Sequence, residues 1–135
     1  MSRLIILDTS IFVSDLRTGQ YRQRVQTLRG LVRTSAVVLA ELWRGATREA
    51  ERDFLRALQR NHPVLLPTAN NWLDSGQLLS RIYADTGFEP AKLRDLHFDV
   101  LIALTARSHG ACLITTNRAD FELIRRYQSF EFEVW

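Results

Sequence analysis

The stretch "LIILDTSIF", residues 4–12, places an aspartate directly after a short apolar run. A continuous apolar run of this length is typical of a strand buried on both faces of a parallel sheet. Asp8 ends the run, and Thr9 and Ser10 are predicted to begin the next helix. Burying an unpaired charge is costly, so Asp8 needs a structural or chemical partner. Asp8 is therefore either the N-cap of that helix or one part of a chemical site.

Strands and helices are predicted to alternate along the rest of the chain. The apolar spacing and the stop signals predict helices over residues 21–31, 37–45, 48–61, 68–87, 98–110 and 117–127, with a loop or irregular helix over 88–97. Short apolar or alternating runs predict strands over 4–7, 33–36, 63–67, 111–116 and 131–135. This order predicts one α/β domain, residues 1–135, with a mostly parallel sheet and right-handed crossovers.

The composition is that of an ordinary globular protein. The chain has 135 residues, of which 46% are hydrophobic and 24% are charged, enough for one core. Its apolar runs are much shorter than the roughly 20 residues of a membrane helix, and no secretion leader is expected at its start. Cys112 is the only cysteine, which excludes an intrachain disulfide and favours a small buried side chain. We therefore expect a cytoplasmic protein.

The basic residues are almost all arginine. The formal net charge is +3, and Lys92 is the only lysine among 18 basic residues. The planar guanidinium suits phosphate, so a nucleic-acid partner is compatible, although a genomic bias toward arginine explains the same composition. Arginines recur every four residues along one predicted helix, where they form either a solvated charged face or a basic rim that guides RNA: Arg48, Arg52, Arg56 and Arg60.

Four of the 15 acidic residues lie apart from the polar helix faces. Ligands of open parallel sheets bind beyond the carboxyl ends of the strands, so acids near those ends are candidates for chemistry. One acid ends the first strand, one interrupts the apolar run "AVVLAELW", one opens the most apolar helix, and one follows the strand "CLITT". They are Asp8, Glu41, Asp99 and Asp120.

Each of these acids also has a purely structural explanation. Asp8 could cap a helix, Glu41 could pair with Arg44, Asp99 could favour a helix N-terminus, and Asp120 could form a capping box with Asn117. If the four converge, however, their charges must be neutralised. Mg²⁺ prefers oxygen ligands and keeps several waters, and it can supply a nucleophilic water to phosphoryl chemistry. Together the acids indicate a divalent-metal site.

Four ordered blocks of the sequence resemble the PIN domain family, and more narrowly the VapC toxins of bacterial toxin–antitoxin pairs. The blocks span nearly the whole chain: "LDTSIF" (7–12), "AELWRG" (40–45), "FDVLIALTA" (98–106) and "TTNRADF" (115–121). The resemblance implies a three-layer α/β/α sandwich with a central five-stranded parallel sheet. It also implies Mg²⁺-dependent endoribonuclease activity, in which Mn²⁺ can substitute for Mg²⁺.

The resemblance further implies which residues and partners take part. Carried over by position, the catalytic and metal-binding acids are Asp8, Glu41, Asp99 and Asp120, and the hydrogen-bonding residues near them are Ser10, Thr116 and Asn117. The implied partners are an RNA substrate and a VapB-like antitoxin, within a homodimer and a toxin–antitoxin hetero-oligomer. Asp95 is expected to have a surface or capping role, His97 to be a hydrogen bonder, and Trp43 to line either the antitoxin groove or the core.

Three alternatives remain open. A PIN-like RNA-binding or RNA-processing module that is not a toxin would share the same blocks, although the intact set of four acids favours an enzyme. A phosphatase with an aspartyl nucleophile would place a second Asp at position 10, where this chain has Ser10. A signalling receiver domain would need an acidic pair after the first strand and a lysine after a late strand, whereas Lys92 precedes the helix that contains Asp99.

Overall fold

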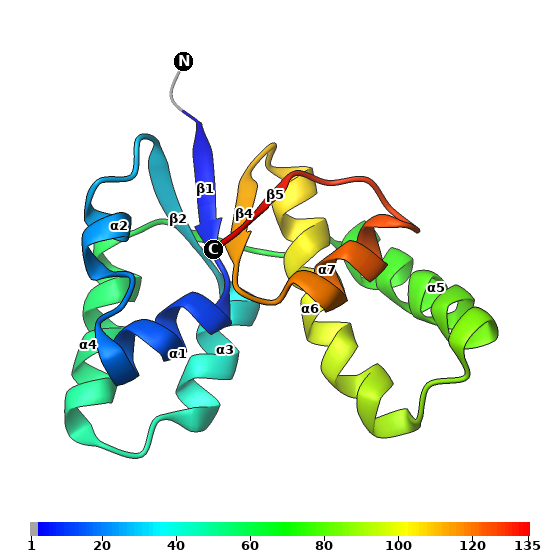
Figure 1. Ribbon diagram of the computed structural model, residues 1–135, viewed down its shortest axis with the longest axis horizontal. Coiled ribbons are helices and arrows are strands. Elements are labelled where there is room, and N and C mark those ends of the chain that lie inside the picture. Colours follow the sequence, from blue (N-terminus) through cyan, green and yellow to red (C-terminus); the bar gives the residue numbers. More distant parts are fainter. Residues whose placement is uncertain (1–2) are drawn as a thin grey trace.

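Strand β1 (Leu4–Leu7) lies at the centre of a five-stranded parallel sheet in the computed structural model, which describes residues 3–135 (Figure 1). The strand order is β3-β2-β1-β4-β5, and every pairing is parallel. The other strands are β2 (Leu31–Ser35), β3 (Val64–Leu65), β4 (Cys112–Thr115) and β5 (Phe132–Val134). The chain therefore leaves β1 toward β2 on one side and later returns to place β4 on the other.

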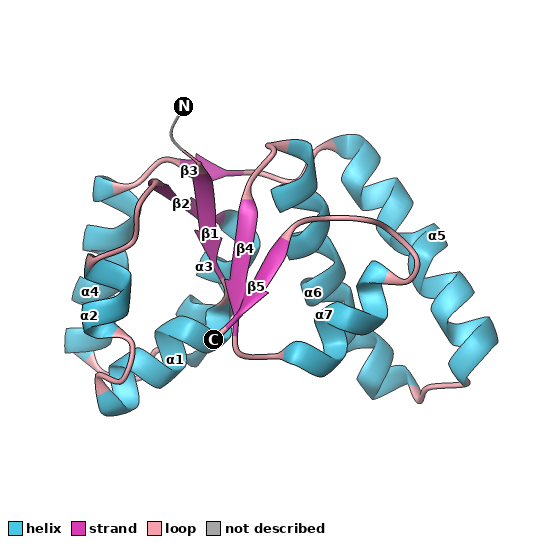
Figure 2. Cartoon of the chain, turned by 45° about the horizontal axis from the view of Figure 1, so that its top comes forward, coloured by secondary structure: helices cyan, strands magenta, loops and turns pink. Residues whose placement is uncertain are grey.

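Two groups of helices flank this sheet, as Figures 1 and 2 show. The first group comprises α1 (Thr9–Thr18), α2 (Arg22–Gln26), α3 (Ala36–Gly45) and α4 (Glu49–Asn61). The second comprises α5 (Ala69–Thr86), α6 (Pro90–Ser108) and α7 (Arg118–Arg125). The predicted fold class, an α/β/α sandwich around a five-stranded parallel sheet, is confirmed.

The central strands are buried on both faces, as the apolar run at the start of the sequence predicted. Ile6 pairs in register with Leu113, and Leu7 pairs with Ile114. Ile6, Leu113 and Ile114 are fully buried. Burial of each such side chain stabilises the fold by about 1.5–3 kcal/mol. This core fixes the positions of the residues that follow β1 and β4.

The prediction of a loop or irregular helix over residues 88–97 was wrong. Helix α6 begins at Pro90 and runs without interruption to Ser108. Proline suits the first turn of a helix, because its missing N–H would have no partner there. Leu96, fully buried, extends the apolar side of the helix toward its start. Lys92 and Asp99 consequently lie on one helix, seven residues or about two turns apart.

The predicted helix over 21–31 is too long, because α2 ends at Gln26 and β2 already begins at Leu31. The close approach of two backbones explains this boundary. Leu31 donates its N–H to the Arg3 carbonyl at 2.7 Å. Gly30 has a φ of +148°, and a Cβ there would lie 2.6 Å from the same carbonyl oxygen. A glycine is needed at the point where the chain enters the sheet.

Two further expectations concern the environment of Cys112 and the presence of membrane-spanning helices. Cys112 is buried and free, as expected for a small core side chain. None of the helices over residues 3–135 combines the length and apolar character that a membrane crossing requires.

Candidate functional site

The site lies at the carboxyl ends of β1 and β4, where the direction of the strand order changes. In open α/β sheets, ligands bind at such a switch point. The Asp8 N–H donates to the Ile114 carbonyl at 2.8 Å and so holds the two strand ends together. Thr116 and Asn117 directly follow β4. The residues that leave both strands therefore line a common edge of the sheet.

Asp8 is a buried carboxylate held by two hydroxyls. It is 4% exposed, and its Oδ2 accepts hydrogen bonds from Thr115 Oγ1 at 2.7 Å and Ser10 Oγ at 2.8 Å. Burial raises the pKa of Asp8, and these hydroxyls together with the backbone N–H groups of Thr9 and Ser10 oppose that increase. Asp8 occupies the N-cap position of α1, but its side chain makes no capping hydrogen bond.

The hydroxyls around Asp8 form a small network across the two strand ends. Ser10 Oγ lies 3.3 Å from Thr115 Oγ1 and accepts the N–H of Thr116 at 3.1 Å. Thr115 Oγ1 also accepts the N–H of Asn117 at 3.0 Å. Ser10 and Asn117, both expected near the site, belong to this network. Thr116 contributes its backbone N–H, whereas the hydroxyl that contacts the carboxylate beside that of Ser10 comes from Thr115, which was not predicted.

Glu41 reaches the same region from α3. Its Oε1 accepts a hydrogen bond from Thr9 Oγ1 at 2.8 Å. Burial raises the pKa of Glu41, the negative charge of Asp8 raises it further, and the Thr9 hydrogen bond and the charge of Arg44 oppose the increase. Thr9, which was predicted to begin the helix after Asp8 and to supply a nearby hydroxyl, therefore orients this carboxylate. The Arg44 guanidinium lies over the Phe98 ring, 5.4 Å from its centroid.

Asp99 joins the other three acids electrostatically. It lies on α6, and burial together with the negative charges of Asp8, Glu41 and Asp120 raises its pKa to about 8. Like charges shift a pKa strongly only when they are close and poorly screened by water. Asp99 is therefore close enough to the other three predicted acids for their charges to act on it.

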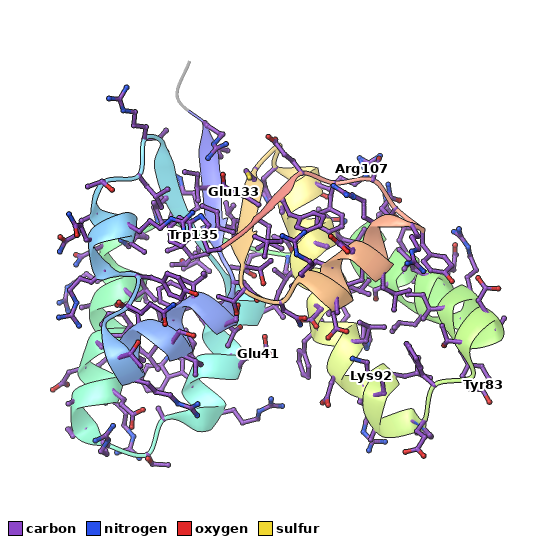
Figure 3. All side chains as sticks on the ribbon, viewed as in Figure 1. Glu41, Tyr83, Lys92, Arg107, Glu133 and Trp135 are labelled. Atoms are coloured by element: carbon purple, nitrogen blue, oxygen red, sulfur yellow. The ribbon has the colours of Figure 1, made fainter. Side chains whose placement is uncertain are left out.

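Asp120 is paired with a basic residue that the sequence analysis had not assigned to the site. Its Oδ1 lies 2.8 Å from Lys92 Nζ, and its Oδ2 accepts a hydrogen bond from Asn117 Nδ2 at 3.0 Å. Burial acts to raise the pKa of Asp120, but Lys92 and Asn117 together lower it. Asn117 is also the N-cap of α7 and accepts the Asp120 N–H at 3.4 Å. In Figure 3, Glu41 lies beside α3 and Lys92 beside α6, both below the ends of the strands.

Other residues considered from the sequence lie around this group. Asp95 is exposed, although its charge adds to the increase in the pKa of Glu41. His97 Nε2 lies 2.9 Å from Ser75 Oγ, which confirms a hydrogen-bonding role, on a helix and not in a loop. Trp43 packs against the core and donates its Nε1–H to Gln59 Oε1 at 2.6 Å.

Of the four arginines that recur every four residues, three form ion pairs with acids of α4: Arg48, Arg52 and Arg56. Arg48 lies 3.4 Å from Glu51, and Arg52 lies 3.4 Å from Glu49. Arg56 contacts both Glu49 and Asp53. These exposed pairs favour a solvated charged face over a basic rim that is free to bind RNA.

A cavity of about 600 Å³ lies next to Glu41, between α1, α3 and α4. Its walls combine apolar side chains, of which Leu42 and Leu55 are buried, with charged ones at the rim. The lining includes Thr9, Val13, Leu16, Arg17, Glu41, Leu42, Arg48 and Leu55. This cavity opens beside a carboxylate of the site and is large enough to receive side chains of a second molecule.

The donor set of the site suits a hard divalent cation. All four acids offer oxygen ligands. Their negative charges repel one another, and a bound cation would neutralise them. Within residues 3–135, no three or more His, Cys, Asp or Glu side chains are grouped closely enough to hold a metal directly. Mg²⁺ is commonly held by one or two carboxylates and several waters. The residues therefore fit a largely hydrated ion.

Comparison with known proteins defines the family. The model of the PIN domain matches residues 5–127, and the chain belongs to the PIN domain family. A comparison with curated proteins finds no match.

Solved structures of toxin–antitoxin complexes share the fold. VapBC2 from Rickettsia felis, bound to a promoter DNA fragment, is 22% identical with a TM-score of 0.72, and 98% of each chain is covered. VapBC-1 from nontypeable Haemophilus influenzae is 24% identical with a TM-score of 0.70, also over 98% of each chain. DNA-bound VapBC from Salmonella typhimurium is 23% identical with a TM-score of 0.69, over 100% of this chain and 99% of the other.

Proposed function

We propose that this protein is a Mg²⁺-dependent endoribonuclease that acts as the toxin of a toxin–antitoxin pair. The observation that carries the proposal is the buried Asp8 carboxylate, held by Thr115 at the ends of β1 and β4 in a PIN fold. The charges of Asp8, Glu41 and Asp120, which raise the pKa of Asp99, support it. Acids in such an arrangement serve phosphodiester chemistry when a divalent cation neutralises them.

In this proposal Asp8, Glu41, Asp99 and Asp120 would hold the metal together, at most two of them directly and the others through water. A bound Mg²⁺ supplies a water of lowered pKa and positive charge for the phosphoryl oxygens. Ser10 and Thr115 keep the buried Asp8 carboxylate in one orientation, and Thr9 does the same for Glu41. Such fixed partners lower the cost of reorganising the site during the reaction.

A VapB-like antitoxin is the proposed partner, and its docking site is the cavity beside Glu41. Several structural neighbours are VapBC complexes, which supports this assignment. The cavity offers apolar contacts at Leu42 and Leu55 and opposite charges at Arg17 and Glu51. A peptide segment seated there would cover one side of the acid group and block access of RNA.

RNA cleavage under metal control tests the nuclease. The purified protein is incubated with a mixed transfer, ribosomal and messenger RNA pool in Mg²⁺, in Mn²⁺ and in excess chelator. Discrete cleavage products are expected with either metal and none with chelator. Full activity in chelator, or no cleavage of any pool with metal, would contradict the proposal. Asp99→Asn, prepared in the same way, is the control for a contaminating nuclease.

Growth measurements separate a toxin from an RNA-processing module. Induced expression in a bacterial host is expected to stop growth, and Asp99→Asn is expected to leave growth normal. Growth arrest should also be relieved by co-expression of a small protein encoded directly upstream. Metal-dependent cleavage without growth arrest would favour the RNA-processing alternative, since the chemistry would stand while the toxin role would fail.

A further inference from the structure

Lys92 forms an ion pair with Asp120, one of the four acids of the candidate site. Its ammonium lies 2.8 Å from Asp120 Oδ1, while Asn117 Nδ2 takes the other carboxylate oxygen at 3.0 Å. Both oxygens of Asp120 are therefore engaged by groups of the protein itself. The pair is partly shielded from water, because the side chains of Lys92 and Asp120 are 41% and 22% exposed.

The fold directs this lysine to the site. Lys92 precedes Asp99 by about two turns of α6, so both side chains leave the same face of the helix. Asp120 lies in the first turn of α7, which packs against α6. The Lys92 ammonium also lies 5.9 Å from the centroid of the Phe88 ring, which limits its alternative positions. It is the only lysine of the chain.

We propose that Lys92 is an internal cation that holds Asp120 in the metal-free protein and competes with the divalent ion for this carboxylate. The inference rests on the proposed function, since it requires that the acid group binds a metal. Two effects act in the same direction. The ammonium repels a nearby divalent charge, and it removes one carboxylate from the set of ligands.

A purely structural role for the ion pair leads to a different expectation. If Lys92 only joined α6 to α7, its loss would lower stability and leave metal affinity unchanged or reduced. If Lys92 competes with the metal, its loss has opposite effects on the stability of the metal-free and the metal-bound protein. The metal-free protein becomes less stable because Asp120 loses its paired cation, while the metal-bound protein gains a ligand.

Calorimetric titration of MnCl₂ into Lys92→Met tests the competition. We expect this variant to bind Mn²⁺ roughly three- to tenfold more tightly than the parent protein, from the removal of one nearby positive charge. Arg94→Met removes an equal charge from an exposed position on the same helix and should stay within about twofold of the parent. Lys92→Arg keeps the charge and should also stay close to it. The double variant Lys92→Met/Asp120→Asn should not show the tighter Mn²⁺ binding of Lys92→Met.

Thermal melts in chelator and in Mn²⁺ provide the second measurement. Lys92→Met should melt below the parent in chelator and show a larger upward shift when Mn²⁺ is added. Unchanged or weaker Mn²⁺ binding by Lys92→Met would overturn the competition while leaving the nuclease proposal intact. Absence of Mn²⁺ binding by both proteins would overturn the metal site itself.

Discussion

The Thr115 hydroxyl donates a hydrogen bond of 2.7 Å to the buried carboxylate of Asp8. This contact joins the ends of the two central strands, because Thr115 is the last residue of β4 and Asp8 directly follows β1. It allows a carboxylate that is 4% exposed to remain within the core. The site is thus built on the buried, central strands of the sheet, and sites built on strands are placed more precisely than sites on loops.

Thr115→Val is expected to destabilise the protein by about 1–3 kcal/mol, because a buried acceptor loses a donor without a change in side-chain volume. Urea unfolding in chelator measures the change. Thr116→Val is the matched control and should stay within about 0.5 kcal/mol of the parent, since Thr116 contributes its backbone N–H to the network. Equal stabilities of the two variants would show that the Asp8 contact is unimportant.

The stability of the metal-free protein is expected to fall as the pH rises from about 4 to 8. Burial and the three neighbouring acids raise the pKa of Asp99 to about 8 from an ordinary value of 3.8. The folded state therefore binds a proton at this site that the unfolded state has already released, and ionisation penalises the folded state across that interval. Above pH 8 this contribution no longer changes.

Asp99→Asn provides the control for this pH dependence. The variant cannot ionise at position 99, so its melting temperature should fall less than that of the parent between pH 5 and pH 8 in chelator. The difference between the two proteins should also shrink when Mn²⁺ is added, because the metal favours the ionised carboxylate. Parallel pH profiles of parent and variant in chelator would contradict the assignment of the raised pKa to Asp99.

Gly30→Ala is expected to destabilise the fold by about 1–3 kcal/mol through backbone strain. The added Cβ would meet the Arg3 carbonyl oxygen at 2.6 Å and the Ile5 Cδ1 at 2.9 Å. Gly45→Ala is the comparison, because nothing lies within 4 Å of the position of its Cβ. Chemical unfolding should show a clear loss for the first variant and little change for the second; similar curves would mean that the entry into β2 tolerates a side chain.

Much of the architecture could be predicted from the sequence, because the central strands β1 and β4 are apolar runs followed by recognisable polar residues. The apolar run 4–7 and the buried run 112–115 indicated parallel strands, and the rule that ligands bind at strand ends selected Asp8 and Asp120. Glu41 was distinguished because it interrupts an apolar run, and Asp99 because it was predicted to open an apolar helix; that prediction was wrong, since α6 begins at Pro90 and Asp99 lies within it. These signals lie within a few neighbouring residues of the chain, so a single sequence is enough to identify them.

The missed residues depend on details that local signals do not determine. Lys92 was overlooked because residues 88–97 were predicted as a loop or irregular helix, which removed the helical spacing that links Lys92 to Asp99. Thr116 was named from the family resemblance, whereas the last residue of β4, Thr115, supplies the hydroxyl that contacts Asp8, and a one-residue shift reverses which face a side chain takes. The pairing of Lys92 with Asp120 joins residues 28 positions apart and required the packing of α7 on α6.

The most direct test of the central claim compares RNA cleavage by the parent, Asp99→Asn and Asp74→Asn in saturating Mn²⁺. Asp74 is an exposed acid on α5 and serves as the control for loss of one negative charge. Asp99→Asn should remain folded by circular dichroism and cleave at least roughly 100-fold more slowly, since it lacks a group that holds the charge-stabilising ion. Asp74→Asn should cleave at the parent rate. Cleavage by folded Asp99→Asn within twofold of the parent would contradict a metal-dependent nuclease site at these four acids.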